Sequence, residues 1–216
     1  MYFFASVGGT ENILIFIMAY DRYVAICDPL HYQNILSRKH CILLASATWA
    51  VGFLNSLVFT IQASHMSFCQ SRTIHQFFCD AKAIINISCA GSAEFYIVVY
   101  LEFLILVFFP VMFNFTSYIK IIWVILQIKS KDGRMKAFST CSSHLSMIIM
   151  YYVTGFCEFM MPISDYSNVL EQVFTVLYSV VTPMINPLIY SLRNKDVKSA
   201  LLRLLGANLN VQKRLS

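Results

Sequence analysis

The strongest constraint on the fold of this chain is a set of apolar blocks that are too long for the core helices of a soluble protein. Cys41–Ile61 runs for 21 residues without a charged side chain, and Val173–Leu192 runs for 20. A helix needs about 20 residues to cross roughly 30 Å of hydrocarbon, because each residue adds about 1.5 Å. Each block is therefore expected to form a helix that spans a membrane.

Three further blocks are nearly as apolar. Tyr2–Tyr20 contains only Glu11, Phe95–Ile119 contains only Glu102, and Ala137–Met161 contains Glu158 and His144. The whole chain is 58% hydrophobic and only 12% charged, whereas about a quarter of the residues of a soluble domain are charged. We therefore predict an all-α membrane protein, a transmembrane helix bundle with five spans at about 2–20, 41–61, 95–119, 137–161 and 173–192.

Basic residues predict the orientation of the bundle. Fourteen of the 16 Lys and Arg residues lie in segments 21–40 and 120–136 and in the tail after Leu192, and only Arg72 and Lys82 lie in the intervening segments. Basic residues accumulate in cytoplasmic loops, so the Met1 end is expected outside and the C-terminus in the cytoplasm. The net charge of +5 then faces anionic membrane lipid, and it needs no nucleic acid to explain it.

Three of the seven cysteines, Cys69, Cys79 and Cys89, fall in the long outer segment 62–94. Disulfides are plausible on the oxidising outer side, but three cysteines cannot all pair within one segment, so one needs a partner elsewhere or stays free. The sequence has no C-x-x-C pair and no His, Asp or Glu cluster with metal or nucleophile spacing. It therefore predicts no metal site, no cofactor and no enzymatic activity.

A helix formed by the first block and the DRY sequence after it would carry Glu11 and Arg22 on one face. At about 100° per residue, Phe4, Glu11 and Arg22 fall within about 20° steps of one another on a helix. An ionisable residue inside a membrane is energetically expensive and usually indicates function. Arg22 can also extend to the membrane boundary, so a role as a lipid anchor is the alternative for this residue.

Four motifs in this order closely resemble the olfactory receptors, a branch of the rhodopsin-like G-protein-coupled receptors. They are "MAYDRYVAICDPLHY" (Met18–Tyr32), C-x9-C-x9-C in the outer segment, "KAFSTCSSHLS" (Lys136–Ser146) and "PMINPLIYSLRNKDVK" (Pro183–Lys198). The resemblance implies one truncated seven-transmembrane receptor domain over residues 1–216. Its five spans correspond to the third to seventh of the family, and the first two spans are expected to be missing. The resemblance also implies that Cys69 pairs with Cys89, and that the partner of Cys79 belonged to the missing turn before the first block.

The resemblance implies a G-protein switch at the cytoplasmic end of the bundle. In the family, the Asp at the position of Asp21 holds the Arg at the position of Arg22 until activation releases it toward the G protein. The residues carried over are Asp21, Arg22 and Tyr23 of the DRY motif, the inner tyrosines Tyr118 and Tyr190, and Asn186 and Pro187 of NPLIY. Glu11 corresponds to an acidic position that can hold sodium together with an Asp of the second span, so it is expected to be the remnant of a sodium site. After NPLIY, Arg193–Leu205 has the pattern of an amphipathic helix on the inner membrane surface.

The ligand pocket is also assigned by resemblance. The expected lining is Phe4, Ala5, Gly8, Gly9, Val99, Glu102, Phe103, Leu106, Tyr152, Gly155, Phe156, Phe159 and Ser179. This lining is mostly apolar and suits a small hydrophobic ligand held by shape, although aromatic stripes at such spacing more often serve packing. Glu102 is the exception. It either contacts a polar or cationic group of the ligand or forms a hydrogen bond with a neighbouring helix.

The expected function is that of an odorant receptor in the plasma membrane. It would bind small, mostly hydrophobic volatile molecules and activate a heterotrimeric G protein of the stimulatory olfactory type, which raises cyclic AMP. The alternative is a non-signalling remnant of a truncated receptor or pseudogene. A membrane enzyme or transporter has little support, because the chain has no catalytic cluster and no pair of broken helices repeated in two halves.

Overall fold

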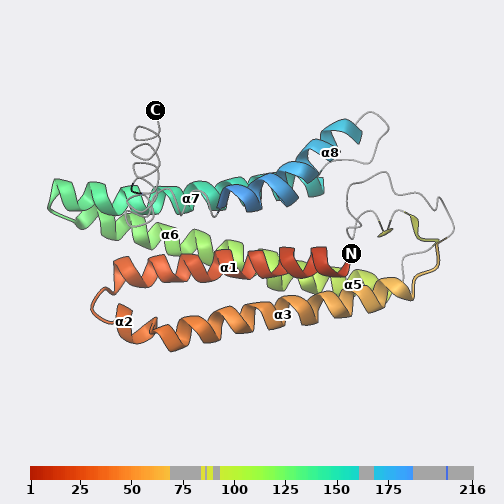
Figure 1. The fold of residues 1–216 in the computed structure, drawn as a ribbon. Coiled ribbons are helices and arrows are strands. Elements are labelled where there is room, and N and C mark those ends of the chain that lie inside the picture. The colour runs from red at the N-terminus through yellow and green to blue at the C-terminus, as the bar shows by residue number, and fades with distance from the viewer. Residues whose placement is uncertain (69–83, 86, 90–92, 161–167, 187–202, 204–216) are drawn as a thin grey trace, which may run out of the picture. The chain divides into compact units, whose positions relative to one another are not determined.

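The structure, a computed structural model, describes residues 1–68, 84–85, 87–89, 93–160, 168–186 and 203 (Figure 1). The chain divides into two compact units, Met1–His144 and Leu145–Ser216. Every regular element of the described residues is a helix, and the only β pairing among them is an isolated bridge between Phe68 and Ser88. The predicted all-α helix bundle is confirmed.

The first unit is built around α1. It contains α1 (Tyr2–Cys27), α2 (Tyr32–Ile35), α3 (Arg38–Ser64), α5 (Ala93–Glu102), the π-helical segment η1 (Phe103–Phe108), α6 (Phe109–Gln127) and the start of α7 (Lys131–Met160). Within this unit α1 packs mainly against α3 and α6, and it also touches η1 (Figure 1). Helix α3 in turn contacts α5. Helix α1 is therefore the element that joins the others.

The second unit contains the rest of α7, then α8 (Asn168–Val176) and the π-helical segment η2 (Leu177–Val181). The helix continues after η2 to Asn186, where the described part ends. The end of the fifth predicted block and the predicted amphipathic helix at 193–205 lie outside the described residues, apart from Arg203.

Three helices are long and apolar enough to cross a membrane: Tyr2–Cys27, Arg38–Ser64 and Phe95–Gln127. Each contains one of the predicted blocks and extends beyond it, by seven residues at the end of α1 and by eight at the end of α6. The apolar block measures only the part of a helix that can lie in hydrocarbon, whereas backbone hydrogen bonding continues into the charged sequence that follows.

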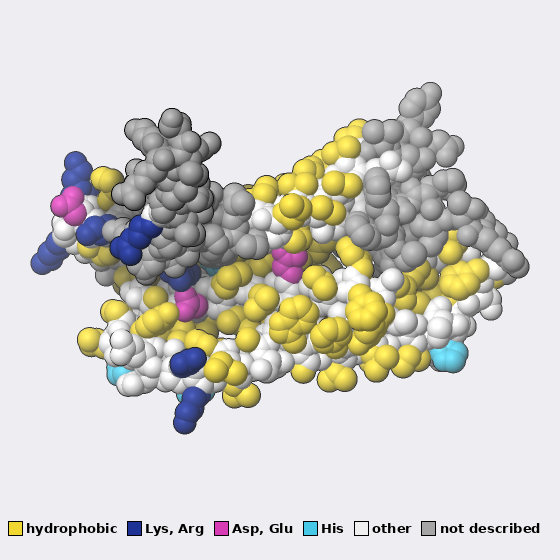
Figure 2. Space-filling view, in the orientation of Figure 1, with side chains coloured by type: hydrophobic (Ala, Val, Ile, Leu, Met, Phe, Trp, Pro, Cys, Tyr) yellow, Lys and Arg dark blue, Asp and Glu magenta, His cyan; other side chains and the backbone are white. Residues whose placement is uncertain are grey.

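The helices bury many polar and small residues and expose many large apolar ones. In α3 the buried positions include Thr48, Gly52 and Ser56, while Leu43 and Leu54 are exposed. Figure 2 shows hydrophobic side chains over much of the visible surface of the described helices. A helix at the surface of a soluble protein has the opposite arrangement, with its apolar stripe toward the core. This distribution fits a bundle whose surroundings are lipid.

The contact between α1 and α3 depends on Gly52. A Cβ atom built on Gly52 would collide with the Thr10 hydroxyl and would lie 2.9 Å from the Ser6 carbonyl oxygen. Thr48, Gly52 and Ser56 are spaced four residues apart, so α3 presents a row of small residues to α1. Membrane helices have little hydrophobic drive to associate, and small residues at an interface allow the close backbone approach that provides dispersion contacts.

Both π-helical segments lie just before a proline. Segment η1 ends two residues before Pro110, and η2 ends two residues before Pro183. Proline has no N–H to donate to the carbonyl four residues earlier, and its ring crowds that carbonyl, so the preceding turn widens. At η2 the hydroxyl of Thr182 donates to the Leu177 carbonyl oxygen at 2.8 Å, which satisfies a carbonyl of the widened turn.

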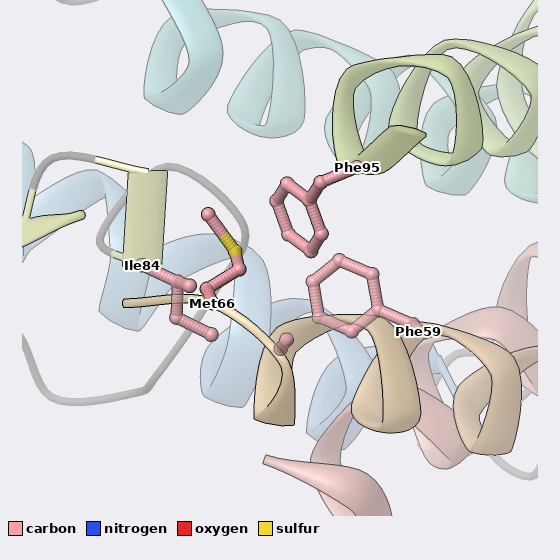
Figure 3. Packing of buried hydrophobic residues seen from close by; sticks show 5 residues of the cluster. Phe59, Met66, Ile84 and Phe95 are labelled. Carbon is pink, nitrogen blue, oxygen red and sulfur yellow. The ribbon is translucent and has the colours of Figure 1, made fainter. Parts of the chain in front are cut away.

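A small apolar cluster closes the first unit at the Met1 end of its helices. Figure 3 shows Phe59 of α3 and Phe95 of α5 with their rings directed toward one another, and their centroids are 5.4 Å apart. Met66 and Ile84 complete the cluster together with Ala63. Nearby, the Cys89 N–H donates to the Ser67 carbonyl oxygen at 2.9 Å, so the segments around residues 67 and 89 lie together.

Replacing Gly52 with alanine should destabilise the first unit. The added methyl group forces α1 and α3 apart, because one of the atoms it meets is a backbone carbonyl that cannot move independently. We expect a loss of about 1–3 kcal/mol, the usual cost of overpacking, measured as a lower midpoint of thermal unfolding in detergent. Gly8→Ala is the matched control, because nothing lies within 4 Å of a Cβ at Gly8. Equal midpoints for the two variants would contradict the proposed role of Gly52.

Candidate functional site

The DRY motif forms an ion pair near the end of α1. Arg22 Nη2 lies 3.0 Å from Asp21 Oδ2, and the two side chains are 35% and 25% exposed, respectively. The other carboxylate oxygen, Oδ1, accepts a hydrogen bond of 2.8 Å from the Tyr32 hydroxyl. Asp21 is therefore held from two directions, by its neighbour in sequence and by a residue eleven positions later.

The turn after α1 places Tyr32 beside Asp21. Helix α1 ends at Cys27, and in the turn Asp28 Oδ1 lies 2.8 Å from His31 Nδ1. The chain then reverses into the short helix α2, which begins with Tyr32. The hydrogen bond to Asp21, with a smaller contribution from burial, raises the pKa of Tyr32 above its ordinary value. Tyr32 was part of the quoted motif, but its role was not predicted, because spacing alone does not show that the chain folds back here.

The third residue of the motif has a different contact. Lys120 Nζ of α6 lies 5.8 Å from the centroid of the Tyr23 ring, a cation–π contact. Tyr23 therefore faces α6 rather than taking part in the ion pair, and it ties the end of α1 to the neighbouring helix.

Tyr118 forms a buried polar contact with α7. Its hydroxyl lies 2.6 Å from His144 Nδ1 and also donates to the Cys141 carbonyl oxygen at 3.4 Å. Tyr118 is only 5% exposed and His144 only 1%. His144 is therefore a buried polar residue of α7. Its pairing with Tyr118 was not predicted, because the two residues are 26 positions apart.

Part of the predicted ligand lining comes together in the first unit. A Cβ atom built on Gly9 would lie 3.8 Å from Leu106 Cδ1 and 4.0 Å from the Cα of Gly52, so α1, η1 and α3 converge at this point. Leu106 is 6% exposed, whereas Phe103 is 48% exposed. Val99 packs against the apolar cluster of Figure 3. The remaining residues of this group on α1, Phe4, Ala5 and Gly8, are half-buried.

Glu102 is hydrogen-bonded to another helix. Asn55 Nδ2 of α3 donates to Glu102 Oε1 at 2.6 Å, and the contact is partly buried. This was one of the two alternatives that the sequence left open for Glu102. Asn55 itself was not predicted as a site residue. The sequence shows an asparagine inside an apolar block, which is unusual, but it does not show which residue this asparagine contacts.

The other predicted lining residues lie in the second unit. A Cβ atom on Gly155 would lie 3.0 Å from Tyr178 Cε2, and the Tyr178 hydroxyl is 3.0 Å from that of Tyr151. Tyr152 and Ser179 are half-buried, and the Ser179 hydroxyl donates to the Thr175 carbonyl oxygen. Phe156 is exposed, and the side chain of Phe159 is not described. The assignment of these residues to a ligand pocket stays a prediction.

Several predicted residues fall at the edge of the described chain or beyond it. Asn186 is buried, and Glu11 is half-buried on α1. Pro187, Tyr190, Cys69 and Cys79 lie outside the described residues. Cys89 is disulfide-bonded, and the predicted pairing with Cys69 stays a prediction. Within the described ranges, no three His, Cys, Asp or Glu residues are grouped so as to hold a metal ion.

Long helices with apolar exteriors and polar buried stripes define a multi-pass α-helical membrane protein. The sequence model of the olfactory receptor family matches residues 1–208. The chain therefore belongs to the olfactory receptor family.

Curated relatives agree with this assignment. The chain is 39% identical to human olfactory receptor 2M2 over 206 residues, which is 95% of this chain and 59% of that protein. It is 42% identical to human olfactory receptor 1L4 over 204 residues, covering 94% and 66%. The values for rat olfactory receptor 1 are 40% over 204 residues, covering 94% and 65%. The chain thus spans less than two thirds of the length of these relatives.

The pKa of Tyr32 should fall when Asp21 is replaced by asparagine. Asp21 favours the neutral phenol in the folded protein, so the contribution of this hydrogen bond is complete below the ordinary tyrosine pKa and disappears as the pH rises through the raised value. The near-ultraviolet absorbance of each protein, minus that of its Tyr32→Phe counterpart, should show ionisation at lower pH in Asp21→Asn. Asp28→Asn is the control, because it removes a nearby charge without removing this bond. If Tyr32 ionised at the same pH in the unmodified chain, in Asp21→Asn and in Asp28→Asn, the assignment would be contradicted.

Replacing Tyr118 with phenylalanine should also lower stability. The change deletes the hydroxyl that meets His144 and leaves the ring in place, so we expect a cost of about 1–3 kcal/mol, typical of a lost buried hydrogen bond. Thermal unfolding in detergent would measure it. Tyr20→Phe is the control, because the Tyr20 hydroxyl makes no hydrogen bond within the described part of the chain. A double variant with His144→Ala should show that the two changes are not additive.

Proposed function

We propose that this protein is an odorant receptor of the plasma membrane. It binds small, mostly hydrophobic volatile molecules within its helix bundle and activates a heterotrimeric G protein of the stimulatory olfactory type, which raises cyclic AMP. The observation that carries the proposal is the family match over residues 1–208. Because the chain spans less than two thirds of its relatives, the activity is proposed here and is not transferred from them.

The geometry near the end of α1 supports a switch. Asp21 holds Arg22 at 3.0 Å, and Tyr32 holds Asp21 at 2.8 Å. In the proposed mechanism this arrangement belongs to the inactive state. Activation releases the Arg22 guanidinium, and the inner tyrosines Tyr118 and Tyr190 turn toward it. A ligand acts by binding the released state more tightly, which shifts the population of a two-state element.

The charge distribution supports an orientation with the Arg22 end in the cytoplasm. Lys129, Lys131, Arg134 and Lys136 are all exposed where α6 connects to α7. Basic side chains of this kind favour the cytoplasmic side and can contact both anionic lipid and an acidic partner. We assign this connection, together with Arg22 and the start of the tail, as the contact surface for the G protein.

The predicted lining supports a ligand site for hydrophobic molecules. Gly9 and Leu106 meet in the first unit, and Gly155 meets Tyr178 in the second. Small residues next to aliphatic and aromatic side chains provide the mostly apolar surroundings typical of small-molecule sites. Each set of lining residues is proposed to provide apolar contacts for the ligand within its own unit.

The test is to express the chain with the olfactory stimulatory G protein and measure cyclic AMP with and without an odorant panel. We expect a response in the unmodified chain and none in Arg22→Ala. Asp21→Asn should raise the odorant-free signal, by no more than about fivefold, because a partly exposed ion pair contributes at most about 1 kcal/mol.

Asp28→Asn is the control for loss of an acidic side chain in the same region, since Asp28 pairs only with His31 among the described residues. Its odorant-free signal should match that of the unmodified chain. A chain that reaches the cell surface and stays silent to the whole panel would overturn the proposal in favour of the non-signalling alternative.

A further inference from the structure

Glu102 belongs to the buried face of its helix. Phe95 is fully buried and Leu106 nearly so, and Glu102 lies between them at helical spacing, seven residues after Phe95 and four before Leu106. Its neighbours in sequence, Leu101 and Phe103, are both about half exposed. The carboxyl group is therefore directed into the first unit and away from the exposed apolar surface.

One oxygen of this carboxyl group is engaged and the other is available. Asn55 Nδ2 donates to Oε1 at 2.6 Å, and this is the only hydrogen bond of Glu102 within the described chain. A carboxylate has two oxygens and about four lone-pair sites. The bond from Asn55 fixes the orientation of the group and leaves Oε2 for a further donor.

The carboxyl group lies one helical turn from the point where three helices converge. Gly9, Gly52 and Leu106 meet there, and one turn toward the Met1 end the corresponding residues are Ala5, Ser56 and Glu102. Ser56 is fully buried, and its hydroxyl has no hydrogen-bond partner within the described chain. A buried hydroxyl without a hydrogen-bond partner costs free energy, and a polar group of a ligand can remove this cost by forming the missing hydrogen bond.

Helix geometry singles out the same position. Glu102 is the last residue before the π-helical segment η1. A widened turn displaces the side chains next to it from regular helical positions, and such turns occur often at functional sites. Pro110, which lies two residues after the end of η1, is the local sequence feature associated with this turn.

We propose that the Asn55–Glu102 pair is a recognition element that selects small aliphatic primary amines, with Glu102 contacting the ligand nitrogen and Asn55 acting as a positioning residue. This inference rests on the proposed receptor function and names the ligand class of that site. A primary ammonium group has three N–H donors and no acceptor, which matches an available carboxylate oxygen and the oxygen of Ser56. Its charge also compensates that of the carboxylate, which strengthens the hydrogen bond where little water is present.

The bound state is the same by either route of proton movement. An ammonium ion can pair directly with the carboxylate, or a neutral amine can take the proton from the carboxyl group, and both give an ammonium–carboxylate pair. The aliphatic part of the ligand then lies among apolar residues such as Val99 and Leu106. An aldehyde has only an acceptor to offer, and a carboxylate ligand meets a like charge.

The test uses hexylamine, hexan-1-ol, hexanal and hexanoate, which share a carbon skeleton and differ in their polar group. Cyclic AMP dose–response curves are recorded in cells expressing the full chain, Glu102→Gln, Asn55→Ala and the control Glu158→Gln, at matched surface levels. We expect hexylamine to be the most potent ligand of the unmodified chain. Glu102→Gln should lose at least about tenfold in hexylamine potency, while its potency for hexan-1-ol changes much less.

Asn55→Ala should lower the ratio of hexylamine to hexan-1-ol potency, a readout that a general loss of folding does not move. Glu158→Gln should leave this ratio unchanged, because Glu158 accepts a hydrogen bond from Thr175 in the other unit.

If Glu102→Gln is not delivered to the surface, the ranking of the four ligands on the unmodified chain still tests the amine assignment. A ranking led by hexanal or hexanoate overturns the amine assignment and leaves the receptor function standing. Silence toward these ligands and toward the odorant panel overturns both.

Discussion

Helices in hydrocarbon gain almost nothing from burying apolar surface against one another, because lipid is as apolar as they are, and this constraint governs the first unit. Association must come from close packing and hydrogen bonds. Gly52 supplies the close packing between α1 and α3. The Asn55–Glu102 bond joins α3 to α5, and the Tyr118–His144 contact joins α6 to α7. The polar residues of the apolar blocks are therefore structural links as well as candidate functional groups.

Three of the five predicted blocks lie in helices long and apolar enough to cross a membrane, because the thickness of the bilayer fixes the length of a span independently of any partner. Cys41–Ile61 lies within α3 for this reason. The positions of the helix ends were harder to predict from the sequence. Helix α1 continues to Cys27 through the charged motif. Charged side chains are unfavourable in hydrocarbon, but they do not interrupt the backbone hydrogen bonds of a helix. The π-helical turns have a local cause in Pro110 and Pro183, but whether a proline kinks a helix or widens its preceding turn depends on tertiary contacts.

Contacts at the candidate site could be anticipated only between residues of one motif. The neighbouring Asp21 and Arg22 were expected to pair, and they do. Tyr32, Asn55 and His144 each act through a residue on another element, and no periodicity encodes the distance between two elements. Asn55 shows the limit well. Its presence in a charge-free block indicates an unusual polar group, yet its partner Glu102 is 47 positions away and is set by how α3 and α5 pack.

These magnitudes constrain how the proposed switch operates. The Asp21–Arg22 pair is partly exposed, and such pairs contribute only about 0–1 kcal/mol. The charge-assisted hydrogen bond from the Tyr32 hydroxyl to the Asp21 carboxylate contributes about 1.5–3 kcal/mol more. A ligand can shift the two states by no more than its difference in affinity for them. One charge-assisted bond at Glu102, at about 1.5–3 kcal/mol, is of the same order as this restraint. Gly9 and Arg22 both lie on α1, about 20 Å apart along a continuous helix, so a shift of α1 at the three-helix convergence reaches Arg22 directly. If Arg22 were held more strongly, the ligand would need more contact area to release it than the few small and apolar residues around Gly9 and Leu106 provide.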